Sequence, residues 1–232
     1  MSCYSGPKIT SANLVFHVDF ANRKSVSGNN LIDLMSRKIP VTLVNPGNNT
    51  LSIANGHATF TPSTESTQSS YYSIANTYFN NIKNEMTVEA CVYASSFPVG
   101  GSRIISPRVN ETGSSIGFNI GNGNIGYEVN HGGSWKTGSF SKSGTSNSWL
   151  HITQTTSNTA NVMITYINGS NVGAVSIPGT LADGGGFLIG LGYYGGAKYS
   201  AGKVAYLKVY NRSLTESEIK QNFNALRGRF GI

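Results

Sequence analysis

Apolar and polar residues alternate with a period of two along much of the chain. The alternation is clearest over Leu14–Phe20, Glu85–Pro98 and Val204–Tyr210. Because successive side chains of a strand point to opposite faces, this pattern predicts strands with one buried face. Shorter segments of the same kind are His57–Thr61, Tyr71–Ile74, Arg103–Ser106, Ile116–Ile120, Ile125–Val129, Trp149–Thr153 and Phe187–Leu191. Turn-forming residues separate these segments, which indicates an antiparallel β protein.

The clearest predicted hairpin runs from Val162 to Ile177. Its two strands, Val162–Ile167 and Asn171–Ile177, flank Asn168-Gly169, a pair that favours a type I′ turn. The segment GNGN after Ile120 predicts a second hairpin. Many short strands separated by turns predict an all-β fold, in which two antiparallel sheets form a jelly-roll sandwich.

One short helix is predicted after Tyr210. Thr215 and Glu218 have the spacing of a capping box, in which each side chain bonds the backbone N–H of the other residue. Leu214 and Ile219 are placed to form a hydrophobic staple across the cap. The expected apolar stripe, and the residues expected to end the helix, are Ile219, Phe223 and Leu226, then Arg227 and Gly228.

A chain of 232 residues fits one β-sandwich domain. We expect a lead over residues 1–13, the domain over 14–226 and a tail over 227–232. Charged residues make up only 12% of the chain, about half the usual fraction of roughly 25%. The tail, RGRFGI, is expected either to dock on an acidic neighbour or to pack back on the sandwich through Phe230.

The formal net charge is +7, but the 17 Lys and Arg residues are scattered along the sequence. A nucleic-acid groove needs clustered basic residues with aromatic residues between them, so we expect no nucleic-acid partner. A mildly basic surface suits an acidic assembly partner or an anionic glycan. Cys3 and Cys91 are the two cysteines, and Cys91 lies in an apolar strand pattern that predicts a buried free thiol.

Two further patterns bear on where the protein is made. Met1–Thr10 has no apolar core of a signal peptide, and no run of about 18 apolar residues occurs anywhere. We therefore expect synthesis in a cytoplasm and no membrane partner.

No motif predicts catalysis. Gly121–Gly126 and Gly190–Gly195 match G-x-G-x-x-G, but neither is predicted to open a helix, as a dinucleotide site requires. Retaining glycoside hydrolysis needs two carboxylates about 5–5.5 Å apart. Glu85 and Glu89 are spaced for one face of a strand, but the residue between them on that face is Thr87 and not a third acid. Structural or solvated roles are therefore favoured for both. The histidines share no metal-like spacing, so we assign no catalytic residue and no metal ligand.

Both ends of the chain resemble a known family. Lys203–Tyr210, the NRSL turn that follows and the helix over Glu216–Leu226 are similar to the end of concanavalin A-like, laminin-G-like jelly-roll domains, and IKQNFNALRGRFG resembles the versions found in virion proteins of tailed bacteriophages. GPKI at Gly6–Ile9, the strand over Leu14–Phe20, and WLHIT at Trp149–Thr153 fit the same family. The chain departs from it at Leu31-Ile32-Asp33-Leu34, where only part of a W-x-D-L-S-G-N stretch remains.

This resemblance implies a non-enzymatic virion structural protein, a capsid decoration or fibre-like subunit made in the host cytoplasm. Other virion proteins would be its partners, and it would be oligomeric in the particle. The alternative is a glycan-binding adhesin that attaches to host-surface polysaccharide, and a glycoside hydrolase is the third possibility. No cofactor is assigned. Relatives bind calcium through loop oxygens, which Asp183, Asn168 and Asn211 could supply here.

A binding surface is the remaining candidate for function. Tyr193, Tyr194, Lys198 and Tyr199 lie in a glycine-rich loop between the last two predicted strands, and Trp135 lies in the loop HGGSWK. Aromatic rings stack on sugar rings, and polar groups bind the hydroxyls, so these residues are predicted to contact carbohydrate or a partner protein. Alternatively, the tyrosines close one end of the sandwich or contact a neighbouring subunit.

Overall fold

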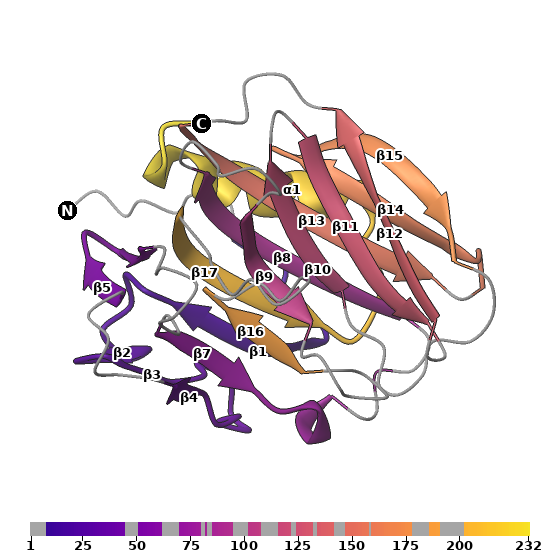
Figure 1. The fold of residues 1–232 in the computed structure, drawn as a ribbon. Helices are drawn as coiled ribbons and strands as arrows, with labels where there is room; N and C mark the ends of the chain where they lie inside the picture. Colours follow the sequence, from indigo (N-terminus) through magenta and orange to yellow (C-terminus); the bar gives the residue numbers. More distant parts are fainter. Residues whose placement is uncertain are drawn as a thin grey trace.

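The computed structural model describes residues 8–44, 51–61, 70–79, 82, 85–94, 102–107, 116–121, 124–131, 134–141, 147–157, 159–177, 186–190 and 202–232. Two antiparallel sheets pack face to face, and one short helix lies on the outer side of one of them (Figure 1). The predicted all-β sandwich with a C-terminal helix is confirmed.

The first sheet has eight strands in the order β15-β14-β13-β8-β17-β6-β5, and β1 also pairs with β17. One edge of β17 pairs with β8, while the other edge pairs first with β6 and then with β1. The strands are β1 (Leu14–Asp19), β5 (Leu51–Ala54), β6 (His57–Phe60), β8 (Glu85–Ala94), β13 (Ser148–Ser157), β14 (Val162–Ile167), β15 (Ser170–Ser176) and β17 (Gly202–Tyr210).

The second sheet has seven strands in the order β12-β11-β10-β9-β16-β7-β4. They are β4 (Thr42–Val44), β7 (Tyr71–Ile74), β9 (Ser102–Pro107), β10 (Ile116–Gly121), β11 (Asn124–His131), β12 (Ser134–Ser141) and β16 (Phe187–Ile189). A small ladder joins β2 (Val26–Ser27) to β3 (Asn30–Leu31), and η1 (Asn76–Tyr78) is a 3₁₀ turn. The apolar pattern missed β12, because SWKTGSFS is mostly polar.

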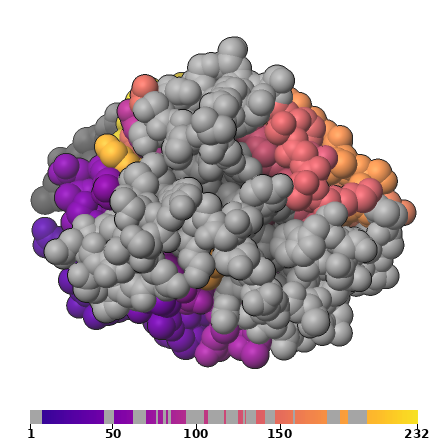
Figure 2. Space-filling model, in the orientation of Figure 1, coloured from indigo at the N-terminus to yellow at the C-terminus, as the bar shows by residue number. Residues whose placement is uncertain are grey.

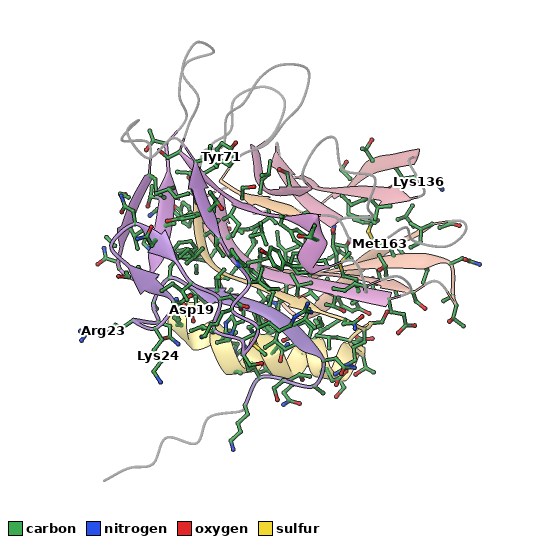
Figure 3. The ribbon with its side chains drawn as sticks, turned by 90° about the horizontal axis from the view of Figure 1, so that it is seen from below. Asp19, Arg23, Lys24, Tyr71, Lys136 and Met163 are labelled. Carbon is green, nitrogen blue, oxygen red and sulfur yellow. The ribbon has the colours of Figure 1, made fainter. Side chains whose placement is uncertain are left out.

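The core fills the layer between the sheets (Figure 3). Phe79 lies at its centre, with edge-to-face contacts to Phe16 and Phe187 at centroid distances of 6.0 and 5.2 Å. Such pairs add about 0.5–1.5 kcal/mol to the free energy gained by burial. Further buried core residues include Val18, Val88, Val92, Ile105, Ile125, Ile152, Met163, Ile189 and Leu207.

The edge strands β12 and β15 meet at one margin of the sandwich, where their segments lie side by side in Figure 2. The Phe140 ring lies over Gly173, where a Cβ atom would come within 2.2 Å of the ring. Lys136 donates a hydrogen bond of 2.9 Å to the carbonyl of Ser176. Side chains therefore close this margin between the two sheets.

An irregularity in β17 overturns the strict alternation predicted for it. The pairing of β17 with β8 shifts register between Val204 and Tyr206, as at a β-bulge. Val204 consequently joins Leu207 and Val209 in the main core, whereas the sequence pattern placed it with Tyr206. A similar shift in β1 sends Leu14 to the outer side of the first sheet, not to the core with the rest of its strand.

The hairpin of β14 and β15 is confirmed. Asn168 and Gly169 have φ angles of 50° and 75°, the positive values that a type I′ turn requires. The side-chain oxygen of Asn168 also accepts a hydrogen bond of 3.0 Å from the backbone N–H of His151. The turn is thereby tied to the neighbouring strand β13.

The helix α1 spans Glu216–Leu226, and its predicted capping box between Thr215 and Glu218 is present. The helix ends at Leu226, within the predicted bounds, but Gly228 does not follow it in a left-handed conformation. The chain continues into the 3₁₀ turn η2 (Arg227–Arg229), so Gly231, and not Gly228, takes a left-handed φ, of 67°. Within the described residues, no helix is long and apolar enough to cross a membrane.

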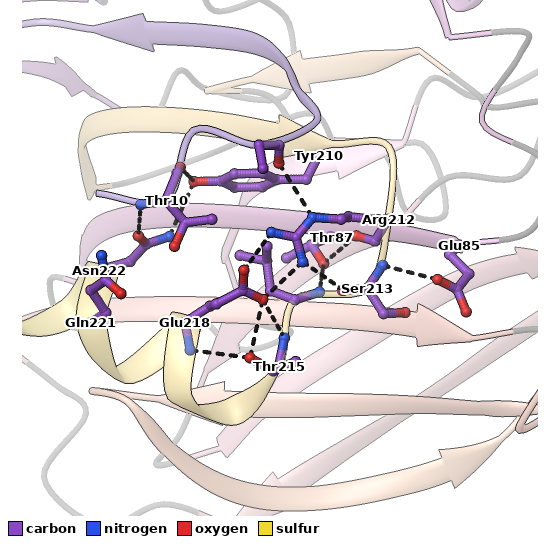
Figure 4. Close-up of polar contacts among 12 residues, drawn as sticks. Thr10, Glu85, Thr87, Tyr210, Arg212, Ser213, Thr215, Glu218, Gln221 and Asn222 are labelled. Carbon is purple, nitrogen blue, oxygen red and sulfur yellow. Dashed lines mark hydrogen bonds and ion pairs between the residues drawn. The ribbon is translucent and has the colours of Figure 1, made fainter. Parts of the chain in front are cut away.

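Buried polar contacts hold α1 against the outer face of the first sheet. Glu89 on β8 is fully buried and accepts hydrogen bonds of 2.7 Å from Lys208 on β17 and 2.6 Å from Asn222 on α1. Asn222 also accepts a bond of 2.7 Å from the backbone N–H of Thr10, so the N-terminal lead is fixed to the helix (Figure 4). The predicted apolar stripe faces the sheet: Ile219 is buried, and Phe223 and Leu226 are half-buried, with Phe223 against His151. Asn222 is the buried helix residue that the stripe did not include.

Asp33 organises the segment in which the family stretch is incomplete. Its carboxylate is fully buried and accepts bonds of 3.0 Å from the backbone N–H groups of His17, Met35 and Ile39. A buried carboxylate is stable when such donors surround it. The protein's own backbone thus supplies the partners of this acid.

The C-terminal tail packs back on the sandwich. Arg229 forms two hydrogen bonds of 2.8 Å to the carboxylate of Asp19, which lies on the helix side of the molecule (Figure 3). The Phe230 ring contacts Trp149 at a centroid distance of 5.0 Å. The packing of Phe230, one of two arrangements expected from the sequence, is therefore the one observed.

We predict that Lys208→Met lowers the free energy of unfolding by roughly 3–5 kcal/mol, because Glu89 would remain buried without its counter-charge. Urea unfolding of the variant and the parent protein measures this difference. Lys220→Met, which removes the same charge from an exposed position on α1, should change stability by less than about 0.5 kcal/mol.

The double variant Glu89→Gln/Lys208→Met removes both charges and should recover part of the loss. A loss below about 1 kcal/mol for Lys208→Met alone would show that α1 does not depend on the buried ion pair.

We also predict that acid destabilises the fold through His17. Burial, assisted by the charge of Lys208, lowers the pKa of His17 from 6.5 to about 4. The unfolded chain therefore binds a proton near pH 6.5, which the folded chain accepts only near pH 4. Stability is complete above this window and falls as the pH drops through it.

Unfolding free energies at about pH 7 and about pH 5 test the effect, and His17→Gln should show a smaller loss than the parent protein. An equal loss in both proteins would assign the acid sensitivity to other groups. The stabilising contribution of Glu89, whose pKa is lowered from 4.5, is lost mainly below pH 4.5, so it changes little between about pH 7 and about pH 5.

Candidate functional site

Most of the predicted contact residues lie outside the described residues. Tyr193, Tyr194, Lys198 and Tyr199 fall in the undescribed range 191–201. The strands on either side of this range belong to different sheets, because β16 pairs with β7 and β9 whereas β17 pairs with β8. The tyrosine-bearing connection therefore leads from one sheet to the other.

Other connections between the sheets meet the same end of the sandwich. In the first sheet, register aligns Leu51, Phe60, Ala94, Ser148 and Gly202 at this end. These residues begin or end the strands joined by the connections 45–50, 61–70, 95–101, 142–147 and 190–201. We call this the loop-bearing end. Surface loops on a rigid β scaffold are where binding residues commonly lie.

Trp135 is not brought together with the tyrosine-bearing connection. Position 135 pairs with Asn130. The register of β11, β10, β9 and β16 places this pair at the end of the second sheet where β16 begins with Phe187. Gly190, where the connection starts, follows the opposite end of β16. The backbone therefore places position 135 and the start of the connection at opposite ends of the second sheet, with β9, β10 and β11 between their strands.

A cluster that the sequence reasoning missed lies on the first sheet next to the loop-bearing end. Lys203, Tyr93 and Trp149 occupy directly opposite positions on three adjacent strands, β17, β8 and β13. The Tyr93 and Trp149 rings are 5.6 Å apart, and the Lys203 ammonium lies 4.9 Å from the Tyr93 ring. His57 on β6 contacts Trp149 at 5.5 Å. We call these four half-buried residues the aromatic rim.

The aromatic rim contains one positive charge, on Lys203. Burial lowers the pKa of His57, and the charges of Lys203 and Arg229 lower it further. Arg229 is paired with Asp19, but in the part of the chain that the structure describes no ion pair involves Lys203. No spacing along the sequence could have signalled this group, since its members come together only through strand register.

The acids considered for hydrolysis have structural partners. Burial by itself raises the pKa of Glu89, but the Lys208 ammonium and the His151 ring outweigh it and hold the pKa well below its usual range. A general acid needs a raised pKa and access to substrate, and Glu89 has neither under α1. Glu85 accepts a hydrogen bond of 3.2 Å from Ser157. The structural roles predicted for both residues are thus supported.

His151 and Cys91 are also buried near Glu89. His151 Nε2 lies 3.3 Å from Glu89 Oε1, but the contact lacks hydrogen-bond geometry, and neither ring nitrogen bonds a described residue. The contacts of the His151 side chain are electrostatic, with Glu89, and aromatic, with Phe223 at 5.7 Å. Cys91 is buried with a free thiol, as predicted.

The residues considered for calcium do not form a cluster among the described positions. Asn168 lies beside His151, which pairs with Cys91, whereas Asn211 follows Tyr210, which pairs with Thr87. Cys91 and Thr87 are four residues apart along β8, so the two asparagines lie at different heights on the sheet. The side-chain oxygen of Asn168 already accepts a hydrogen bond from the backbone N–H of His151. Asp183 lies outside the described residues. Over the described ranges, no group of three His, Cys, Asp or Glu residues could hold a metal ion.

The fold is shared with solved receptor-binding domains. The chain is similar to the binding domain of botulinum neurotoxin DC in complex with rat synaptotagmin II, with a TM-score of 0.71 and 16% identity over 93% of this chain and 52% of that one. The same domain in complex with SialylT gives 0.69 and 15% over 92% and 52%. The binding domain of Paraclostridial Mosquitocidal Protein 1 gives 0.63 and 16% over 91% and 52%. The chain therefore spans about half the length of these structures.

Sequence comparison gives a family but no individual relative. No curated protein matches the chain. A family model described as the concanavalin A-like lectin/glucanases superfamily matches residues 66–220, which contain β7 to β17 and the start of α1. The match covers well over half of the sequence. The chain belongs to the concanavalin A-like lectin/glucanases superfamily.

Proposed function

We propose that the protein is a non-enzymatic glycan-binding module. The observation that carries the proposal is the loop-bearing end, where a tyrosine-rich connection between the sheets enters β17 beside the aromatic rim. Aromatic rings with a few polar groups are the usual components of a sugar site. Family membership supports this choice of ligand, and so does the binding of SialylT by a similar fold.

The absence of enzymatic activity is part of this proposal. Glu89 is enclosed between Lys208 and Asn222, and its low pKa does not suit a proton donor. A module of this kind would hold a polysaccharide without cleaving it.

We propose in addition that the module serves in the virion of a tailed phage, as a capsid decoration or fibre-like subunit bound to other virion proteins in several copies. The support is sequence resemblance at both ends of the chain, in GPKI with its following strand and in IKQNFNALRGRFG. Attachment to host-surface polysaccharide is compatible with this place and is the alternative role.

Replacing Tyr193, Tyr194 and Tyr199 together by Ala should weaken binding to a recognised polysaccharide at least about tenfold, since each lost stacking contact removes favourable free energy. A glycan array identifies the ligand, and isothermal titration measures the change. Trp135→Ala, tested separately, reports whether the opposite end of the second sheet contributes.

The same titrations with calcium and with a chelator should agree, and incubation should release no reducing ends. Full binding by the triple variant would remove these tyrosines from the site. Cleavage that Glu89→Gln abolishes would identify a hydrolase.

A virion role predicts that the purified protein co-sediments with particles of the source phage that lack it. Intact host cells, tested in parallel, distinguish the two roles. Binding to particles alone supports an assembly subunit, whereas binding to cells that host polysaccharide competes away supports an adhesin. Absence of the protein from purified particles would rule out the virion role.

A further inference from the structure

The outer face of the first sheet is covered unevenly. Glu89, Lys208 and His151 lie on the central strands β8, β17 and β13 and are enclosed beneath α1. Tyr93 and Trp149, two positions along β8 and β13 from Cys91 and His151, are only half-buried. The aromatic rim is therefore a part of this face that the described residues leave partly open.

The rim side chains stand side by side across adjacent strands, and the Tyr93 and Trp149 rings meet edge to face, with an interplanar angle of 68°. Lys203, Tyr93 and Trp149 are cross-strand partners, so their side chains share one face of the sheet. Trp149 is held by Tyr93, His57 and Phe230, at centroid distances of 5.6, 5.5 and 5.0 Å. Side chains fixed in this way are preorganised, which reduces the entropy lost on binding.

Charge decides which ligand suits the rim. Lys203 contributes an ammonium group that no described carboxylate neutralises. Arg229 also lies near His57, but it is neutralised by its two hydrogen bonds to the carboxylate of Asp19. Among the described rim residues, Lys203 is therefore the charge that a ligand would meet. A positive charge attracts an anionic ligand, whereas it adds no such attraction to the binding of a neutral ligand.

We propose that the aromatic rim binds an acidic saccharide, with a sugar ring against Tyr93 and Trp149 and a carboxylate or sulfate group at Lys203. This inference rests on the proposed glycan-binding function and assigns to it a site and a ligand class. β17 starts at Gly202, directly before Lys203, so the tyrosine-bearing connection and the rim are continuous along the chain.

The test compares oligosaccharides of alginate, which carry a carboxylate on every ring, with neutral dextran oligosaccharides of equal length. Isothermal titration of the full chain should show at least about tenfold tighter binding of alginate, with affinity that falls as salt is added. Lys203→Met should reduce alginate affinity about tenfold. The matched control, Lys220→Met, changes the net charge equally on exposed α1 and should leave affinity unchanged.

Tyr93→Leu provides a second variant, with circular dichroism to verify its fold. It removes the ring beside Lys203 but keeps an apolar side chain against Trp149, and it should also weaken alginate binding. Dextran bound as tightly as alginate, or alginate affinity unaffected by both variants, overturns this inference and leaves glycan binding in place.

Two other outcomes count against the proposals more broadly. Preferential binding of single-stranded oligonucleotides, which also stack on aromatic rings beside cations, would make the rim a nucleic-acid site. Binding of no saccharide on the array or in titration would overturn both the inference and the proposed function.

Discussion

The arrangement of the C-terminal half depends on one buried ion pair. Glu89 and Lys208 lie on neighbouring central strands, β8 and β17, and neither is exposed by more than 1%. Two charges removed from water are stable only when their hydrogen bonds are satisfied, and Asn222 of α1 supplies the remaining partner of the carboxylate. The sheet therefore specifies where the helix must lie, and through Thr10 the helix specifies where the N-terminal lead must lie.

Local signals in the sequence predicted much of the fold. The Asn168-Gly169 turn and the Thr215 cap appear as expected, because each depends on residues only a few positions apart. The bulge at Val204 and the strand β12 were not predicted. A bulge adds a residue without any composition signal, and β12 is held in place by its pairing with β11 although its own residues are mostly polar.

The candidate site shows the same limit. Tyr193 and its neighbours could be proposed because they cluster within one loop of the sequence. The aromatic rim could not, because Tyr93, Trp149 and Lys203 are distant in sequence and meet only through the register of three strands. Asn222 was missed for a related reason: an amide on a helix face has meaning only once the carboxylate beneath it is known.

The closed margin between β12 and β15 has a consequence for assembly. Unpaired strand edges invite other chains to add strands, and proteins commonly protect them. Lys136 already bonds the Ser176 carbonyl, and Phe140 covers Gly173, so that neighbourhood is poorly suited to strand addition. Addition of a strand from another copy of this chain is therefore disfavoured at this margin.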